Sequence, residues 1–169
     1  WLNNTIKSML NWTKSIKLRK NNFPRFNDSP IDGCPKIDNV INFANSFIYG
    51  HEISLKKLKG IRKKLISYSG ENETKLQKSN VKSILNLEDT GWTIMRPGLG
   101  WEVVVKSGES GPKHLAGHTH SDLFSFDIFH NGIPIIVECG TSTYQMNKIR
   151  NYERSGQAHN VFELLHKDK

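Results

Sequence analysis

The stretch FSFDIFHNGIPIIV, residues 124–137, decides the fold class of the chain. Aromatic and β-branched residues alternate with polar ones before Asn131-Gly132, and an apolar run follows the pair. An Asn-Gly pair between two such runs is typical of a tight β-hairpin, because both residues tolerate a positive φ. The stretch therefore predicts two antiparallel strands joined by a two-residue turn.

Two stretches upstream have the same character. Residues 90–96 and 101–105 are rich in aromatic and β-branched residues, and they are bounded by Pro97-Gly98 and Ser107-Gly108. Both stretches predict strands. We therefore expect residues 90–165 to be mainly antiparallel strand.

The first half of the chain has a helical period instead. Apolar residues fall three or four positions apart over residues 1–19 and again over residues 37–48, which predicts two amphipathic helices. Asn21-Asn22-Phe23-Pro24 breaks the first of them. Ser54 is a candidate N-cap for a third helix, and residues 69–82 have the polar composition of a linker.

The order of these elements predicts an α+β, multidomain chain. Consecutive helices followed by consecutive strands are typical of an all-α region joined to an antiparallel β region. We place a helical domain at residues 1–75 and a β domain at residues 76–169. The sequence opens on Trp1 and stops soon after the apolar run at residues 161–165, so we expect it to be an internal piece of a longer protein.

Positive charge is concentrated in the first half of the chain. Residues 1–88 carry 16 Lys and Arg against 7 Asp and Glu, whereas residues 89–169 carry 8 against 9. Such a surplus attracts nucleic acid, acidic polysaccharide or an anionic membrane surface, or it forms a solvated helix face. No apolar run approaches the roughly 18 residues of a membrane-spanning helix, so membrane insertion is not expected. Cys34 and Cys139 have no metal-binding spacing.

The motif His118-Thr119-His120 is the first candidate for chemistry. Residues two apart in a strand project to the same face, so the two imidazoles can serve one metal or one substrate. Glu138, which follows an apolar run, and His159 add a carboxylate and a third imidazole. Two imidazoles and one carboxylate are a sufficient ligand set for zinc. Ordinary core or surface histidines are the alternative.

A series of segments in a fixed order carries a family resemblance: residues 117–126, 132–141, Tyr144, 150–154 and 158–160, with residues 24–29 and 91–96 upstream. The series resembles the heparinase II/III-like family of polysaccharide lyases. The resemblance implies the C-terminal helices of an incomplete (α/α) toroid, followed by an antiparallel β-sandwich domain that is incomplete at its C-terminus. It also implies β-elimination on a uronic-acid polysaccharide such as a glycosaminoglycan or alginate, with that acidic polysaccharide rather than nucleic acid as partner, in the periplasm or outside the cell.

The resemblance implies roles for individual residues as well. His118 would face the substrate and Tyr144 would be the acid candidate, with Tyr152 as an alternative donor. A structural zinc would be bound by His120, Glu138 and His159. The family usually has Asp where Glu138 stands, and the additional methylene moves the carboxylate by about 1.5 Å. Further catalytic groups of the toroid would lie before the first residue, so we do not expect a complete active site here.

Two other function classes remain open at this point. One is a noncatalytic protein that binds or assembles acidic glycan on the same scaffold. The other is a cupin-like metalloenzyme, which the absence of a Glu from residues 121–127 makes less favourable. Asp122 is a candidate to orient a histidine or to cap a turn, and Arg150 to pair with a substrate carboxylate or a nearby glutamate.

The basic surplus generates a first prediction. If the positive side chains of residues 1–88 attract an acidic glycan over a distance, affinity for a polyuronate should fall steeply as salt rises through about 0.15 M, where the Debye length is ~8 Å. Binding isotherms at low and high salt measure this. Equal affinities at both would show that the charged face is merely solvated.

Overall fold

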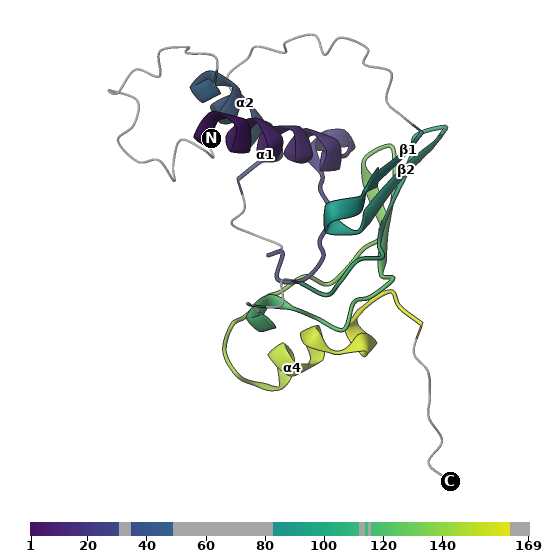
Figure 1. The fold of residues 1–169 in the computed structure, drawn as a ribbon. Coiled ribbons are helices and arrows are strands. Elements are labelled where there is room, and N and C mark those ends of the chain that lie inside the picture. The colour runs from purple at the N-terminus through teal and green to yellow at the C-terminus, as the bar shows by residue number, and fades with distance from the viewer. Residues whose placement is uncertain (31–34, 49–82, 112–113, 115, 163–169) are drawn as a thin grey trace. The chain divides into compact units, whose positions relative to one another are not determined.

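The computed structural model describes residues 1–30, 35–48, 83–111, 114 and 116–162. These residues fall into two compact units. The first contains residues 1–23 and 35–48 and is helical, and the second contains residues 24–30 and 83–162 and holds the sheet (Figure 1). The helix predicted from Ser54 and the linker at residues 69–82 lie outside the described residues.

The helical unit contains the two predicted helices, α1 (Leu2–Ile16) and α2 (Ile37–Ile48). Each buries an apolar stripe, which includes Leu10 on α1 and Ile41 on α2. Lys17, just after α1, forms an ion pair with Asp38 in the first turn of α2. Both predictions are confirmed. No helix in the described part of the chain has the length and apolar character that crossing a membrane requires.

The second unit is built on a five-stranded antiparallel sheet whose strands lie in chain order (Figure 1). The strands are β1 (Ile84–Leu87), β2 (Trp92–Gly98), β3 (Trp101–Lys106), β4 (Phe126–His130) and β5 (Ile133–Ile136). The prediction of helices followed by an antiparallel β region is therefore confirmed. Strand β1 was not predicted from the sequence.

The predicted hairpin joins β4 to β5. His130 pairs with Ile133 across the turn, and Asn131 and Gly132 have φ angles of 49° and 70°. Positive φ at both positions matches the right-handed twist of the strands, and Asn-Gly adopts it at low cost. The Asn131-Gly132 prediction is confirmed.

The expectation that residues 90–165 are mainly strand is wrong. Among the described residues, neither the stretch between β3 and β4 nor the stretch beyond Ile136 contains a strand. Residues 148–154 form helix α4 (Lys148–Arg154). Asn147 caps this helix by accepting a hydrogen bond from the Arg150 amide at 2.9 Å. A helix of two turns carries too few apolar residues to show a clear period, and the cap is its main sequence signal.

One face of the sheet buries charged groups. On β3 the buried side chains are Glu102, Val104 and Lys106, and on β4 they include Asp127. The buried face of β4 thus carries Asp127 beside the apolar Phe129, whereas Phe126 and Ile128 on the other face are only half-buried. Buried charges are expensive unless they are paired or hydrogen-bonded, so this face needs polar partners.

Residues 24–29, which precede the sheet by more than fifty positions, supply those partners. The Arg25 amide donates to Asp127 at 3.0 Å, and the Asn27 amide donates to Asp122 at 3.2 Å. Burial raises the pKa of Asp127 to about 6, against the hydrogen bonds from the Arg25 and Glu138 amides. Phe26 packs edge-on against Trp92, with 5.0 Å between the ring centroids. The segment is thus an integral part of the β unit.

A buried ion pair completes this attachment. The Lys106 ammonium lies 2.5 Å from Asp122 and donates to the Asn27 side-chain oxygen at 2.8 Å. The side chains of Lys106 and Asp122 are 2% and 0% exposed. Of the two roles considered for Asp122 from the sequence, neither describes its side-chain contacts, which go to Lys106 and the Asn27 amide.

Gly140 allows the end of the same segment to come close to the chain after β5. Its φ is 61°, and a Cβ atom there would lie 2.1 Å from the Ser29 carbonyl oxygen. The Thr141 amide donates to that carbonyl at 3.2 Å, and Pro30 and Thr141 form a parallel bridge. A side chain at position 140 would push residues 28–30 away from the residues after β5.

The buried pair yields a second prediction. Lys106→Met leaves the Asp122 carboxylate buried without its cation, so the free energy of unfolding should fall by about 3–5 kcal/mol. Denaturant unfolding monitored by tryptophan fluorescence measures the loss. Lys148→Met, at an exposed lysine of the same unit, is the matched control and should change stability by less than about 0.5 kcal/mol. Similar values for the two variants would contradict the role given to the pair.

Candidate functional site

The two histidines of the motif lie in different environments. His118 ends a short 3-10 turn at Ala116–His118, so the expectation that the motif lies in a strand is wrong. The His118 side chain is 58% exposed, whereas that of His120 is fully buried. The ring of His118 is therefore accessible to solvent, whereas the ring of His120 is not.

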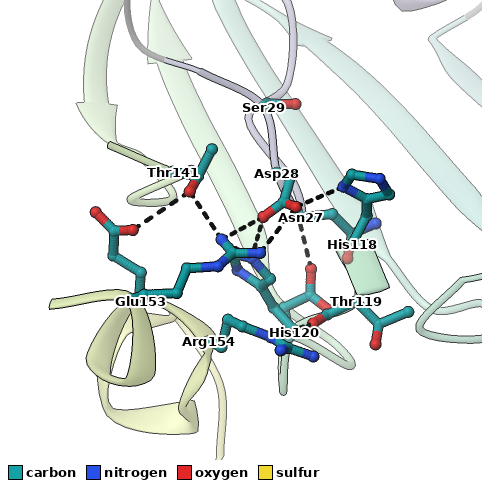
Figure 2. Close-up of polar contacts among 12 residues, drawn as sticks. Asn27, Asp28, Ser29, His118, Thr119, His120, Thr141, Glu153 and Arg154 are labelled. Carbon is teal, nitrogen blue, oxygen red and sulfur yellow. Dashed lines mark hydrogen bonds and ion pairs between the residues drawn. The ribbon is translucent and has the colours of Figure 1, made fainter. Parts of the chain in front are cut away.

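Both rings nevertheless contact the same carboxylate, that of Asp28 (Figure 2). Asp28 Oδ2 lies 2.7 Å from His118 Nδ1, and Oδ1 lies 2.8 Å from His120 Nε2. Burial raises the pKa of Asp28, but the hydrogen bonds from Arg150, His120 and His118 outweigh it and lower the pKa to about 2. Asp28 is therefore ionised at neutral pH and acts only as an acceptor.

Arg150 holds Asp28 from the other side. Its guanidinium binds both carboxylate oxygens, with Nη1 2.5 Å from Oδ1 and Nη2 2.9 Å from Oδ2. Nη1 also donates to the Thr141 hydroxyl at 2.8 Å, and that hydroxyl donates to Glu153 at 3.3 Å. Arg150 is 3% exposed, so its partner is Asp28 rather than the substrate carboxylate or glutamate considered from the sequence. We call Asp28, Arg150, Thr141 and Glu153 the Asp28 network.

The three residues proposed as zinc ligands, His120, Glu138 and His159, lie together and are buried. The rings of His120 and His159 have centroids 5.2 Å apart. One oxygen of Glu138 binds His159 Nδ1, and the other accepts from the Asn160 amide at 2.8 Å. Burial lowers the pKa of His120, more than its contact with Asp28 raises it, and this favours the neutral ring.

Two ring nitrogens in this group fit a metal. His120 Nδ1 and His159 Nε2 are buried and have no hydrogen-bond partner among the described residues. Neutral imidazole nitrogens with free lone pairs are good zinc ligands. Both oxygens of Glu138 are engaged, so it ligates only if it releases one of these contacts. In the described part of the chain, no three His, Cys, Asp or Glu side chains are already arranged as a metal site.

The two residues proposed to act on substrate lie side by side at the surface. The rings of His118 and Tyr144 form an edge-to-face pair with centroids 6.1 Å apart. Tyr144 is 62% exposed, and the Arg150 guanidinium lies 5.2 Å from the centroid of its ring. The alternative donor, Tyr152, contacts the Gln157 carbonyl at 3.5 Å instead.

An open hollow of about 570 Å³ lies beside His120. Its lining is polar throughout: Ser110, Thr119, His120, Ser121, Asn151, Arg154 and Ser155. Arg154 donates through Nε to the Thr119 carbonyl at 3.1 Å, and this hydrogen bond holds the guanidinium group at its Nε atom. Hydroxyl, amide and guanidinium groups of this kind can hydrogen-bond sugar hydroxyls and carboxylates.

Sequence reasoning missed Asp28 as a functional candidate. The segment that carries it, residues 24–29, was noted only as part of a family resemblance. Asp28 lies 90 positions before His118, and no local pattern links the two. The signal that was present is a charged residue in a turn-rich segment next to an apolar Phe26.

The comparisons with known proteins agree with this architecture. A family model for the heparinase II/III-like C-terminal region matches residues 80–168, and the chain belongs to this family of polysaccharide lyases. No curated protein matches the chain.

Two solved structures of a heparinase III, the BT4657 gene product, have the same fold. The second of them carries methylated lysines; the TM-scores are 0.62 and 0.61, both at 21% identity. In each case the match covers 94% of this chain and 23% of the heparinase III chain. The match supports the prediction of helices followed by an antiparallel β domain.

Proposed function

We propose that this chain is part of a polysaccharide lyase that cleaves a uronic-acid polysaccharide by β-elimination. The observation that supports the proposal best is the surface pair His118 and Tyr144. Both side chains are exposed and their rings form an edge-to-face pair. Asp28 contacts the ring of His118, and the Arg150 guanidinium lies against the ring of Tyr144. A periplasmic or secreted location is part of the same proposal, because acidic polysaccharides are found there.

The reaction needs groups of this kind. Elimination breaks the C5–H and C4–O bonds of the uronide, forms a C4=C5 double bond and leaves the proton on the departing glycosidic oxygen. A base must take the C5 proton and an acid must give a proton to the departing oxygen, while a cation or hydrogen-bond donor neutralises the uronate carboxylate. Imidazole and phenol groups can exchange protons near neutral pH. We assign His118 and Tyr144 to these proton transfers.

We further propose that His120 and His159, with Glu138, hold a structural zinc. The two buried nitrogens without partners support this assignment. Zinc bound there would tie the segment around His120 to the segment around His159, which are 39 positions apart in the sequence. The chain's own residues would carry out the proton transfers at the surface.

A noncatalytic glycan-binding protein is the second candidate, and the polar hollow beside His120 favours it. A cupin-like site is less compatible with the geometry. Two histidines that bind one metal must point to the same place, but here one ring is exposed and the other is buried.

Paired substitutions test the proposal in the protein that carries this chain. His120→Ala should lose zinc and lower the melting temperature, because the free energy of metal binding contributes to folding. His118→Ala should keep the metal and lower turnover of a polyuronate by roughly 10²-fold or more. Mass spectrometry measures the metal, and ultraviolet absorbance of the unsaturated product measures turnover.

The outcomes separate the candidates. Equal zinc loss from both variants would show that His118 is a ligand, and a wild-type protein that binds polyuronate without cleaving it would favour the noncatalytic candidate. Glu138→Asp restores the carboxylate that is usual in the family and should retain zinc. Absence of zinc from wild-type protein purified without chelators would contradict the metal site.

A further inference from the structure

We infer that Asp28 is a positioning residue shared by the two histidines: one carboxylate oxygen sets the ring of His120 toward a metal, and the other sets the ring of His118 toward substrate. The inference deepens the proposed function, and it rests on that function for the identity of metal and substrate. The ring orientations themselves follow from the contacts of Asp28.

The first oxygen determines which nitrogen of His120 is available. Asp28 Oδ1 lies 2.8 Å from Nε2, and a carboxylate can only accept, so Nε2 carries the proton. Arg150 Nη1 also lies 3.4 Å from Nε2, but its shorter contacts go to Asp28 and Thr141. The lone pair therefore lies on Nδ1, the buried nitrogen that has no partner among the described residues. A histidine that donates one N–H to a carboxylate commonly offers its other nitrogen to a metal.

The second oxygen determines which nitrogen of His118 is available, and here the protonated nitrogen is Nδ1 rather than Nε2. Asp28 Oδ2 lies 2.7 Å from Nδ1, so Nδ1 carries a proton, and in the neutral ring the lone pair is then on Nε2. Nε2 is then the nitrogen that faces away from Asp28, on a ring that is more than half exposed. A neutral histidine in water prefers its proton on Nε2, so this tautomer depends on the contact with Asp28.

The same interactions make Asp28 rigid enough for this task. Arg150 binds both of its oxygens, and a bidentate pair of this kind fixes direction as well as distance. The preceding residue, Asn27, is held through its amide by Asp122 and through its side chain by Lys106. The carboxylate cannot turn toward one histidine without moving away from the other. The metal side and the substrate side of the site are thus coupled through one group.

Histidine ring NMR tests the inference directly. In wild-type protein at a pH of about 8, where histidine side chains are mostly neutral, the ring ¹⁵N resonances should place the proton of His118 on Nδ1 and that of His120 on Nε2. Asp28→Asn offers a single carbonyl oxygen, so at least His118 should shift to the Nε2–H form. A wild-type His118 protonated on Nε2, or the same tautomers in both proteins, would overturn the inference.

Zinc affinity, measured by competition with a chelator, is the second readout. Asp28→Asn should weaken zinc binding by roughly 10–100-fold, the usual effect of removing a carboxylate that orients a metal ligand. Asn27→Ala is the matched control, because it removes the contact of the neighbouring residue with Lys106 and leaves both rings untouched. It should lower the melting temperature without changing zinc affinity. Equal loss of affinity in the two variants would show that Asp28 only stabilises the fold.

The two readouts distinguish this inference from the proposed function. The tautomers are measured without metal or substrate. If the tautomers are as expected but the protein neither binds zinc nor cleaves polyuronate, the proposed function is wrong. The inference that Asp28 sets the two histidine tautomers is then still correct. If an active, zinc-binding protein has the other tautomers, the inference is wrong and the proposed function stands.

Discussion

The attachment of residues 24–29 to the sheet is the constraint on which the rest of the β unit depends. The sheet buries Asp127 and Lys106 on one face, and Asp122 lies buried beside them. Two backbone amides and one side-chain amide from the segment satisfy these charges. Without the segment, Asp127 would keep the Glu138 amide but lose that of Arg25, and the buried Lys106–Asp122 pair would lose both of its contacts with Asn27. Buried polar groups that lose their hydrogen bonds are costly. These hydrogen bonds, together with the packing of Phe26 against Trp92, thus fix the position of residues 24–29 on the sheet.

The same attachment builds the candidate site. The residue after Asn27 is Asp28, and its carboxylate lies between an exposed ring and a buried one. Arg150 reaches it from α4, and Thr141 and Glu153 support Arg150 in turn. Segments far apart in the chain therefore meet at one carboxylate. A site assembled this way holds its proton donors and acceptors in place before substrate arrives, which is how enzymes reduce the reorganisation needed for reaction.

Local patterns were sufficient for much of the fold and for part of the site. The helical periods of α1 and α2 and the turn chemistry of Asn131-Gly132 depend on near neighbours, and these predictions are confirmed. The sequence analysis grouped His120, Glu138 and His159, and these three residues lie together in the structure. Their binding of zinc and the roles of His118 and Tyr144 stay predictions.

Other features depend on long-range contacts that no local pattern contains. Asp127 on β4 can be buried because the amides of Arg25 and Glu138 donate to it, and the alternation of residues along the strand does not reveal these donors. Asp28 has no neighbour in sequence that marks it as a partner of His118. Helix α4 is too short for a clear period. In each case the missing information was the identity of a partner dozens of residues away.

Hydrogen exchange at the amides of Arg25 and Asn27 tests the central claim most directly. Both amides donate to buried carboxylates, so they should exchange as slowly as the amides that pair β3 with β4, although they belong to no strand. The exposed residues around Met146 in the same unit provide the fast reference. Slow exchange at both amides is the result that this account predicts. Exchange as fast as that around Met146 would contradict it, because the segment would then not be held on the sheet.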